Sequence, residues 1–101
     1  MRMVFIFLIL AGCGAQPAPE FFGAVREEIR RGAHRYVLFR KETRFEIIRL
    51  GPYVPRGPQQ AEQVEFMLAL VEERTGCRVP PQTVVGDAGE IRGTLRCPKR
   101  R

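Results

Sequence analysis

Serine, asparagine and tryptophan are absent from this sequence of 101 residues, and histidine occurs once, at His34. A hydrolase that forms a covalent intermediate needs a nucleophile, a general base and an orienting group, and the chain offers little to build them from. Paired carboxylates are the remaining route to acid–base chemistry. The acidic pairs Glu27–Glu28 and Glu72–Glu73 are neighbours in the chain, so their side chains diverge on a helix or a strand. The sequence therefore predicts a protein that is not an enzyme.

Ligands for metals and cofactors are equally scarce. Beyond the first of its three cysteines, the chain has two cysteines and one histidine, which leave a tetrahedral zinc site incomplete. It contains no Cys-x-x-Cys-His segment for haem attachment. Gly86 and Gly89 have the spacing of a phosphate-binding loop, but we interpret them as a hairpin turn of four residues. We expect neither a metal nor a cofactor.

Long apolar runs are also missing. The longest, Val4 to Ala11, has eight residues, whereas a helix that crosses a bilayer needs about 20. Arg2 supplies a positive charge before this run, and small residues follow it. A charged start, a short apolar region and small residues at its end are typical of a secretory signal.

The apolar run ends in LAGC at residues 10–13, which resembles the lipobox of bacterial lipoproteins. The resemblance implies that diacylglycerol is attached to the sulfur of Cys13 and that cleavage removes residues 1–12. It implies a lipid-anchored protein of the bacterial cell envelope that faces the periplasm. Gly14 is similar to the residue found after the cysteine in lipoproteins of the outer membrane. An ordinary signal, cleaved after Ala15, is the alternative.

These features divide the chain into four parts: a signal peptide at 1–12, a tether at 13–20, a single domain at 21–98 and a basic tail at 99–101. The mature domain is similar to small envelope lipoproteins of unknown function, but no motif in it identifies a family. A chain of this length buries a modest core, so a covalent crosslink would contribute much to its stability.

The resemblance also accounts for the odd number of cysteines. With Cys13 assigned to the lipid, Cys77 and Cys97 remain as an even pair in an oxidising compartment. We expect them to form a disulfide. It would close a loop of about 20 residues, for which the chain-entropy model gives a stabilisation of about 3 kcal/mol.

Positive charge exceeds negative charge, with 17 Lys+Arg against 11 Asp+Glu and an isoelectric point near 10.0. Arginine is concentrated in the first half of the chain. The candidate anion-binding residues are Arg35, Arg40, Arg44 and Arg49. Such a surface favours anionic envelope lipids or glycans as partners, whereas nucleic acid is disfavoured because the periplasm rarely offers it and aromatic residues are few. Alternatively, these arginines form the solvated face of a strand.

Apolar periodicity predicts one helix at about 58–75, starting at Pro58 and ending at Gly76. The predicted buried face of this helix comprises Ala61, Val64, Met67, Leu68 and Val71. Residues 24–31 fit either a helix or a strand, and we favour a strand. Short strands are expected at Thr83–Val85 and at Glu90–Cys97. The predicted fold is α+β: an antiparallel sheet of four or five strands with one helix packed on it.

The segment from Tyr36 to Leu50 reads as a hairpin. A three-residue loop at 41–43 would place Phe39 opposite Phe45, whereas a two-residue loop would place it opposite Glu46. Since apolar cross-strand pairs stabilise a sheet, we predict the three-residue loop.

In that register Val37, Phe39, Phe45 and Ile47 share one face of the hairpin. The opposite face, the candidate interaction face, carries Tyr36, Leu38, Ile48 and Leu50. One helix covers only one face, so the candidate interaction face needs a partner or the chain's own Phe21–Phe22 segment. The sequence therefore predicts a non-catalytic, lipid-anchored envelope module that binds another envelope protein. A binder of anionic lipid or glycan is the alternative, and a small envelope enzyme is the third.

Overall fold

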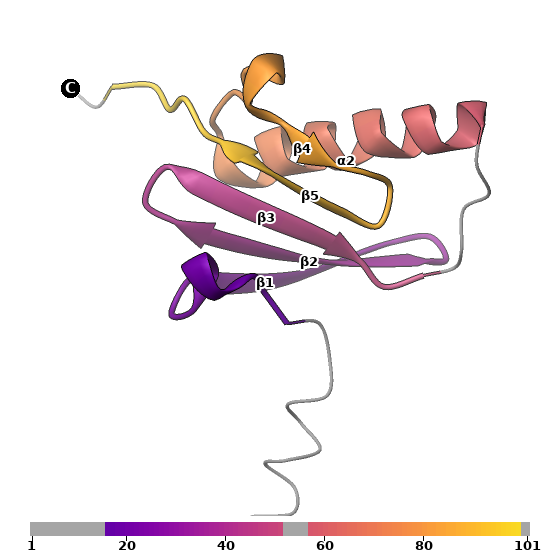
Figure 1. The fold of residues 1–101 in the computed structure, drawn as a ribbon, viewed down its shortest axis with the longest axis horizontal. Helices are drawn as coiled ribbons and strands as arrows, with labels where there is room; N and C mark the ends of the chain where they lie inside the picture. Colours follow the sequence, from indigo (N-terminus) through magenta and orange to yellow (C-terminus); the bar gives the residue numbers. More distant parts are fainter. Residues whose placement is uncertain (1–15, 52–56, 100–101) are drawn as a thin grey trace, which may run out of the picture.

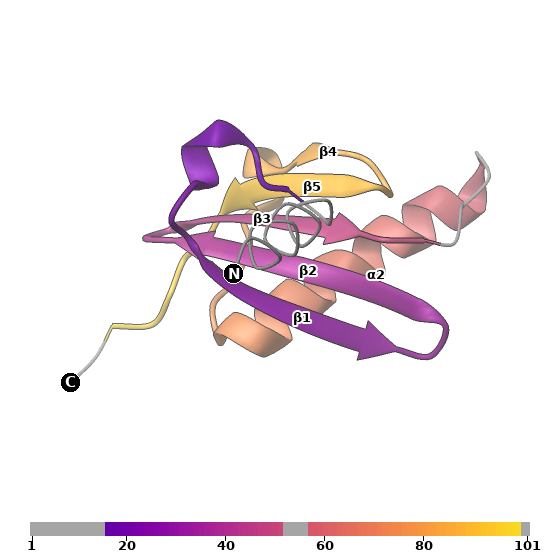
Figure 2. The same cartoon turned by 90° about the horizontal axis from the view of Figure 1, so that it is seen from below.

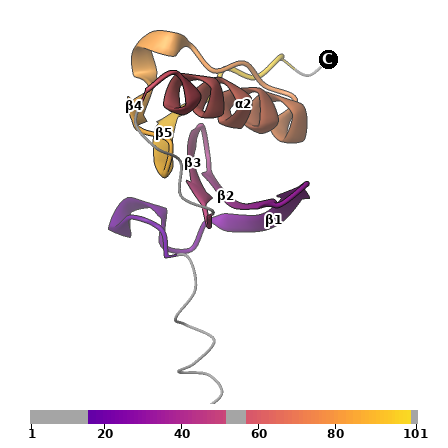
Figure 3. The ribbon, with the colours of Figure 1, turned by 90° about the vertical axis from the view of Figure 1, so that its right-hand side faces the viewer.

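The computed structural model describes residues 16–51 and 57–99, and it has the predicted α+β fold (Figure 1). Five antiparallel strands form one sheet in the order β1-β2-β3-β5-β4. They are β1 (Val25–Arg31), β2 (His34–Lys41), β3 (Arg44–Arg49), β4 (Val85–Gly86) and β5 (Glu90–Thr94). The helix α2 (Pro58–Thr75) lies on one side of the sheet, and the short 3-10 helix η1 (Pro19–Phe21) lies on the other (Figure 3). We call these sides the helix face and the outer face.

The predictions for residues 1–15, including the signal peptide and Cys13, lie outside the described residues. Within the described residues, no helix has both the length and the apolar character needed to cross a membrane.

The helix α2 begins at Pro58 and is capped by Gly76, whose left-handed φ of 73° suits a residue without Cβ. Its buried residues are Met67, Leu70 and Val71. The prediction of the buried face was wrong at two positions, since Ala61 is exposed and Leu70 is buried. Ala61 lies in the first turn of α2, and Figure 2 shows that α2 begins beyond the ends of the strands.

The core lies between α2 and the helix face of the sheet. From the sheet it includes Ile29, Tyr36, Leu38, Phe45, Ile47 and Ile91. Close packing requires glycine at position 93. A Cβ on Gly93 would lie 2.9 Å from Cε1 of Phe45, well inside the usual separation of non-bonded carbons. Gly93 therefore lets the Phe45 ring lie against β5.

The β2–β3 hairpin has the register that sequence analysis rejected. Phe39 is opposite Glu46 and Val37 is opposite Ile48, so the loop has two residues, Glu42 and Thr43. Two-residue hairpin loops usually place glycine or asparagine at positive φ, and here Glu42 takes a φ of 57°. The prediction was wrong because no sequence pattern marks a two-residue turn with Glu42 at positive φ. Nor does any pattern mark Glu46 as a buried residue of the outer face.

The other strands agree with prediction in part. Residues 25–31 form a strand, as favoured, joined to β2 by a turn at Gly32. The strand expected at Thr83–Val85 is instead the 3-10 helix η2 (Pro81–Thr83) followed by β4. The last strand ends at Thr94 rather than Cys97, and only a bridge between Arg78 and Arg96 continues it.

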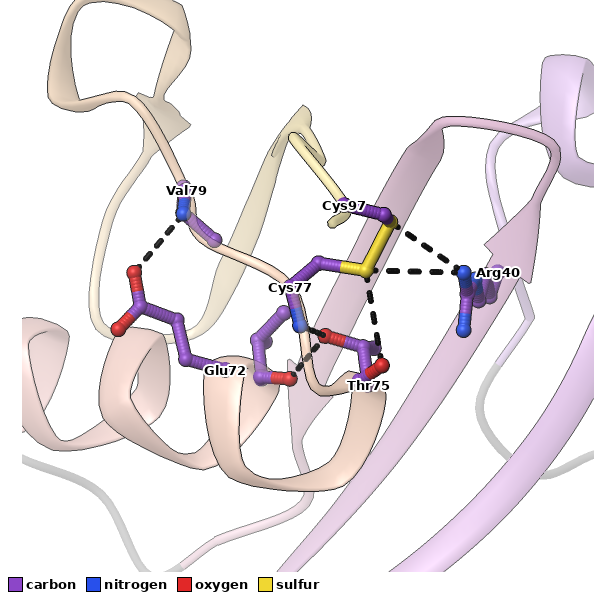
Figure 4. Close-up of a disulfide and its surroundings, with 7 residues drawn as sticks. Arg40, Glu72, Thr75, Cys77, Val79 and Cys97 are labelled. Carbon is purple, nitrogen blue, oxygen red and sulfur yellow. Dashed lines mark hydrogen bonds between the residues drawn. A yellow bond between two sulfur atoms is a disulfide. The ribbon is translucent and has the colours of Figure 1, made fainter. Parts of the chain in front are cut away.

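Cys77 and Cys97 form the predicted disulfide (Figure 4). It joins the end of α2 to the chain that follows β5. Thr75 supports this junction, since its hydroxyl donates to the Val71 carbonyl and accepts from the Cys77 amide. The disulfide therefore fixes the helix to the sheet at one end of the core.

Candidate functional site

The outer face of the sheet is covered by the N-terminal segment of the described chain. Phe21 is 1% exposed and packs against Val37 and Phe39, with Ala18 and Ala24 beside them. Phe22, its neighbour, is 60% exposed. The chain thus supplies its own cover through Phe21 rather than Phe22, and Ala18, which lies in the predicted tether at 13–20, packs on the sheet as well.

This arrangement divides the candidate interaction face between the two sides of the sheet. Tyr36 and Leu38 are buried under α2, whereas Ile48 packs with Val37 on the outer face. Leu50, which follows β3, is 38% exposed. The prediction of one shared apolar face was wrong, because the two-residue hairpin loop shifts β3 by one residue relative to β2 and so exchanges its faces.

A buried carboxylate lies beneath the N-terminal segment that covers the outer face. Glu46, on β3, is 3% exposed, and its Oε1 accepts a hydrogen bond of 2.8 Å from the backbone N–H of Ala18. Glu90, on β5, shares a hydrogen bond with Glu46. Burial, this hydrogen bond and the negative charge of Glu46 together raise the pKa of Glu90 to about 7, despite the opposing charge of Arg92. Glu90 thus keeps its proton to near neutral pH.

Arginines connect this acid pair to the covering segment. The Nε of Arg92 lies 2.9 Å from Oε2 of Glu90. Glu20, in η1, lies 3.5 Å from NH1 of Arg92 and 3.6 Å from NH1 of Arg44. The η1 segment is therefore fastened to the sheet by Phe21, by the Ala18 amide and by two ion pairs of Glu20.

The Glu90 proton makes stability depend on pH. Because the pKa of Glu90 is raised from 4.5 to about 7 by folding, the folded chain holds more protons than the unfolded chain in this interval. This group's contribution to stability therefore falls as pH rises through the interval. We expect Glu90→Gln to melt at a higher temperature than wild type at about pH 8, with the difference shrinking towards about pH 4.5.

Glutamine can keep the hydrogen bond to Glu46 without the charge. The matched control is Glu28→Gln, which removes an exposed carboxylate on the same outer face that pairs with Arg26. Thermal melts at several pH values test this prediction. A Glu90→Gln variant that melts below wild type at pH 8 would contradict it.

The four predicted anion-binding arginines do not converge. Arg40 and Arg49 lie on the helix face, and Arg35 and Arg44 lie on the outer face. Arg40 contacts both sulfurs of the disulfide at 3.6 and 3.8 Å, and Nε of Arg49 donates to the Ala88 carbonyl at 2.8 Å. Nε of Arg44 donates to the Gly93 carbonyl at 3.2 Å. Three of the four guanidinium groups thus have hydrogen-bond acceptors within the described chain, whereas Arg35 is exposed and has no ion pair among the described residues.

Arg35 has a partner that sequence analysis missed. Arg30 is directly opposite it on the outer face of β1, and both are exposed. Across residues 16–51 and 57–99, neither forms an ion pair. Leu50 continues the row, since its amide donates to the Arg35 carbonyl. These three residues, the Arg30–Arg35–Leu50 row, border a small open pocket of about 120 Å³.

Like charges directly opposite each other destabilise a sheet, so two facing guanidinium groups are a candidate site for an anion. The signal that could have revealed the pair is the turn at Gly32, which sets Arg30 opposite Arg35 once β1 is accepted as a strand. In the part of the chain that the structure describes, no group of three His, Cys, Asp or Glu residues could hold a metal ion.

Comparison with protein-family models, with curated protein sequences and with solved structures finds no match for this chain.

Proposed function

We propose that the protein is a non-catalytic module anchored in the bacterial cell envelope through Cys13, which binds phosphate-bearing lipid headgroups through the Arg30–Arg35–Leu50 row. The observation that carries the proposal is the facing pair of exposed guanidinium groups beside an exposed leucine. Arginine binds phosphate oxygens with two parallel hydrogen bonds. Leu50 could enter the interfacial layer beside the headgroup.

The short stretch of chain between Cys13 and Ala18 supports a membrane lipid as the partner. Ala18, which is fixed to the outer face by Glu46, is five residues beyond Cys13 (18 − 13 = 5). Five residues span at most about 18 Å, so a lipid on Cys13 would keep the outer face close to the bilayer. The Arg30–Arg35–Leu50 row lies on that face. Each arginine near an anionic leaflet contributes about 1 kcal/mol to binding.

The anchor can be tested separately from the row. We expect wild type, expressed in a bacterium, to partition into the detergent phase because two or more acyl chains hold a protein stably in lipid. Cys13→Ser should move to the aqueous phase. Cys77→Ser is the matched control, since it removes a different cysteine and should leave the partitioning unchanged. Equal partitioning of wild type and Cys13→Ser would contradict the anchor.

The row is tested with the full chain carrying Cys13→Ser, so that no acyl chain contributes. Binding to vesicles with and without anionic phospholipid is measured by sedimentation. We expect Arg30→Gln/Arg35→Gln to weaken binding to anionic vesicles about 10- to 30-fold, because two contributions of about 1 kcal/mol each are lost.

Arg26→Gln is the matched control, because it lies on the same face of β1 but pairs with Glu28 at 3.1 Å. It should weaken binding much less. If Arg26→Gln loses as much vesicle binding as the double variant, net charge rather than a specific site accounts for the binding. If the double variant binds as tightly as the unmodified row, the role of the row is contradicted.

A second candidate function is binding of another envelope protein, and the edge strand β1 favours it. Among the described strands β1 pairs only with β2, so its other edge has unpaired backbone groups over seven residues. A partner could add a strand there, although the charged residues of β1 are of the kind that blunts an edge. Such backbone pairing would depend little on salt, which separates it from binding through arginine.

A further inference from the structure

A second facing pair of arginines lies at the disulfide end of the molecule. Arg78 and Arg96 form a bridge in which each backbone amide donates to the carbonyl of the other, at 2.8 and 2.7 Å. Neither residue is among the candidates from sequence analysis, since they are 18 positions apart (96 − 78 = 18) and Arg78 lies outside every predicted strand. Both side chains are exposed. Among the described residues neither forms an ion pair.

A disulfide and a hydrogen bond to α2 hold the backbone of these two arginines in place. The Cys77–Cys97 disulfide is the next cross-strand pair (Figure 4). Val79 is buried, and its amide donates to Oε2 of Glu72 in α2 at 2.8 Å. Because side chains alternate along an extended chain, burial of Cys77, Val79 and Leu95 directs Arg78 and Arg96 outward.

The arginine pair borders a pocket of about 360 Å³, which is lined by Arg78, Val79, Pro80, Pro81, Gln82 and Arg96. Its far wall is η2, which is tied to β5 because the Thr83 hydroxyl accepts the Thr94 amide at 3.2 Å. Among residues 16–51 and 57–99, no carboxylate lines this pocket. The site thus presents two positive charges and the Gln82 amide beside the apolar surface of two prolines, with little to rearrange on binding.

We propose that this pocket binds a phosphate monoester carried on a small polar body of about the size of a sugar. Two guanidinium groups balance the two negative charges of a monoester, and each can form paired hydrogen bonds with phosphate oxygens. The prolines give the attached body an apolar wall, and Gln82 gives it a hydrogen-bonding group. The charge at Lys99, two residues beyond Cys97, adds to the attraction.

The position of the pocket separates it from the Arg30–Arg35–Leu50 row. Figures 1 and 3 place η2 at the end of the molecule away from the first described residues. If the chain is anchored through Cys13, as proposed above, the pocket faces away from its own membrane and a soluble or wall-linked ester can reach it. The binding site itself does not depend on the anchor.

The test uses the full chain carrying Cys13→Ser and three probes: inorganic phosphate, glucose 1-phosphate and vesicles containing phosphatidic acid. We expect glucose 1-phosphate to bind saturably, with NMR shifts of the backbone amides of Arg78, Val79, Gln82 and Arg96. Arg78→Gln and Arg96→Gln should each weaken this binding about tenfold or more, because each removes charged hydrogen bonds. Arg26→Gln, the matched control, removes an exposed arginine that belongs to neither proposed site and should leave it unchanged.

The probes identify the source of the phosphate. Tighter binding of glucose 1-phosphate than of inorganic phosphate supports the sugar-sized ester, whereas equal binding overturns that part and assigns the free ion. If the protein binds only the phosphatidic acid vesicles, and Arg78→Gln abolishes that binding, a soluble phosphate ester is ruled out as the ligand. No saturable binding, or equal binding by wild type and both variants, overturns the site. Melting temperatures equal to that of wild type show that the variants fold, so a loss of binding reports on the pocket.

Discussion

Replacing Leu38 by aspartate is expected to unfold most of the protein. Leu38 is 3% exposed and lies on the helix face, in the core cluster that includes Met67 and Leu70 of α2. An aspartate there would bury a charge that has no partner and would lose the packing of the leucine. The combined cost is about 4 kcal/mol or more, which is close to the whole stability of a small domain. Urea denaturation followed by circular dichroism measures the loss.

Leu50→Asp is the matched control, since it makes the same chemical change at a leucine that is 38% exposed. We expect it to change the free energy of unfolding by about 0.5 kcal/mol or less. If Leu38 and Leu50 shared one face, as the sequence predicted, the two substitutions would change the free energy of unfolding by similar amounts. Equal effects of the two substitutions would therefore contradict the hairpin register described above.

Removing the disulfide should have the next largest effect. Cys77→Ala/Cys97→Ala frees a loop with a sequence separation of 20 residues, for which the chain-entropy model gives a loss of about 3 kcal/mol. In a domain of this size such a loss lowers the melting temperature on the order of 15 °C. Calorimetry with and without reductant measures it. Reductant should destabilise wild type to a similar degree and leave the double variant unchanged, and a variant that melts with wild type would contradict the role of the disulfide.

The sequence predicted those parts of the fold that depend on local signals. Pro58 and Gly76 mark the ends of α2 because each suits its backbone position whatever the rest of the chain does. The disulfide followed from pairing the two cysteines that remained after Cys13. The class of the fold followed from one helix among several short strands.

The hairpin register and the candidate site depended on contacts between distant segments. Glu46 reads as a solvated residue until the N-terminal segment lies over it and Ala18 donates to its carboxylate. Glu90 approaches Glu46 only when β5 pairs with β3. Arg78 and Arg96 meet through a single bridge outside the named strands. Alternation of apolar residues along one strand carries no information about these pairings.

The proposed function separates the outer face from the disulfide end. On the outer face, η1 covers the apolar centre and leaves the Arg30–Arg35–Leu50 row exposed beside it. At the disulfide end, the Arg78–Arg96 pair borders its own pocket. Variants at one pair therefore test one kind of binding without disturbing the other.

The salt dependence of vesicle binding tests the central claim most directly. For the Cys13→Ser chain, binding to anionic vesicles through Arg30 and Arg35 should weaken steeply between about 50 and about 300 mM salt, because exposed charges are screened over this range. The Arg30→Gln/Arg35→Gln chain should show a shallower dependence. Vesicle binding that stays constant across this range in both chains would contradict recognition of phosphate headgroups by the row.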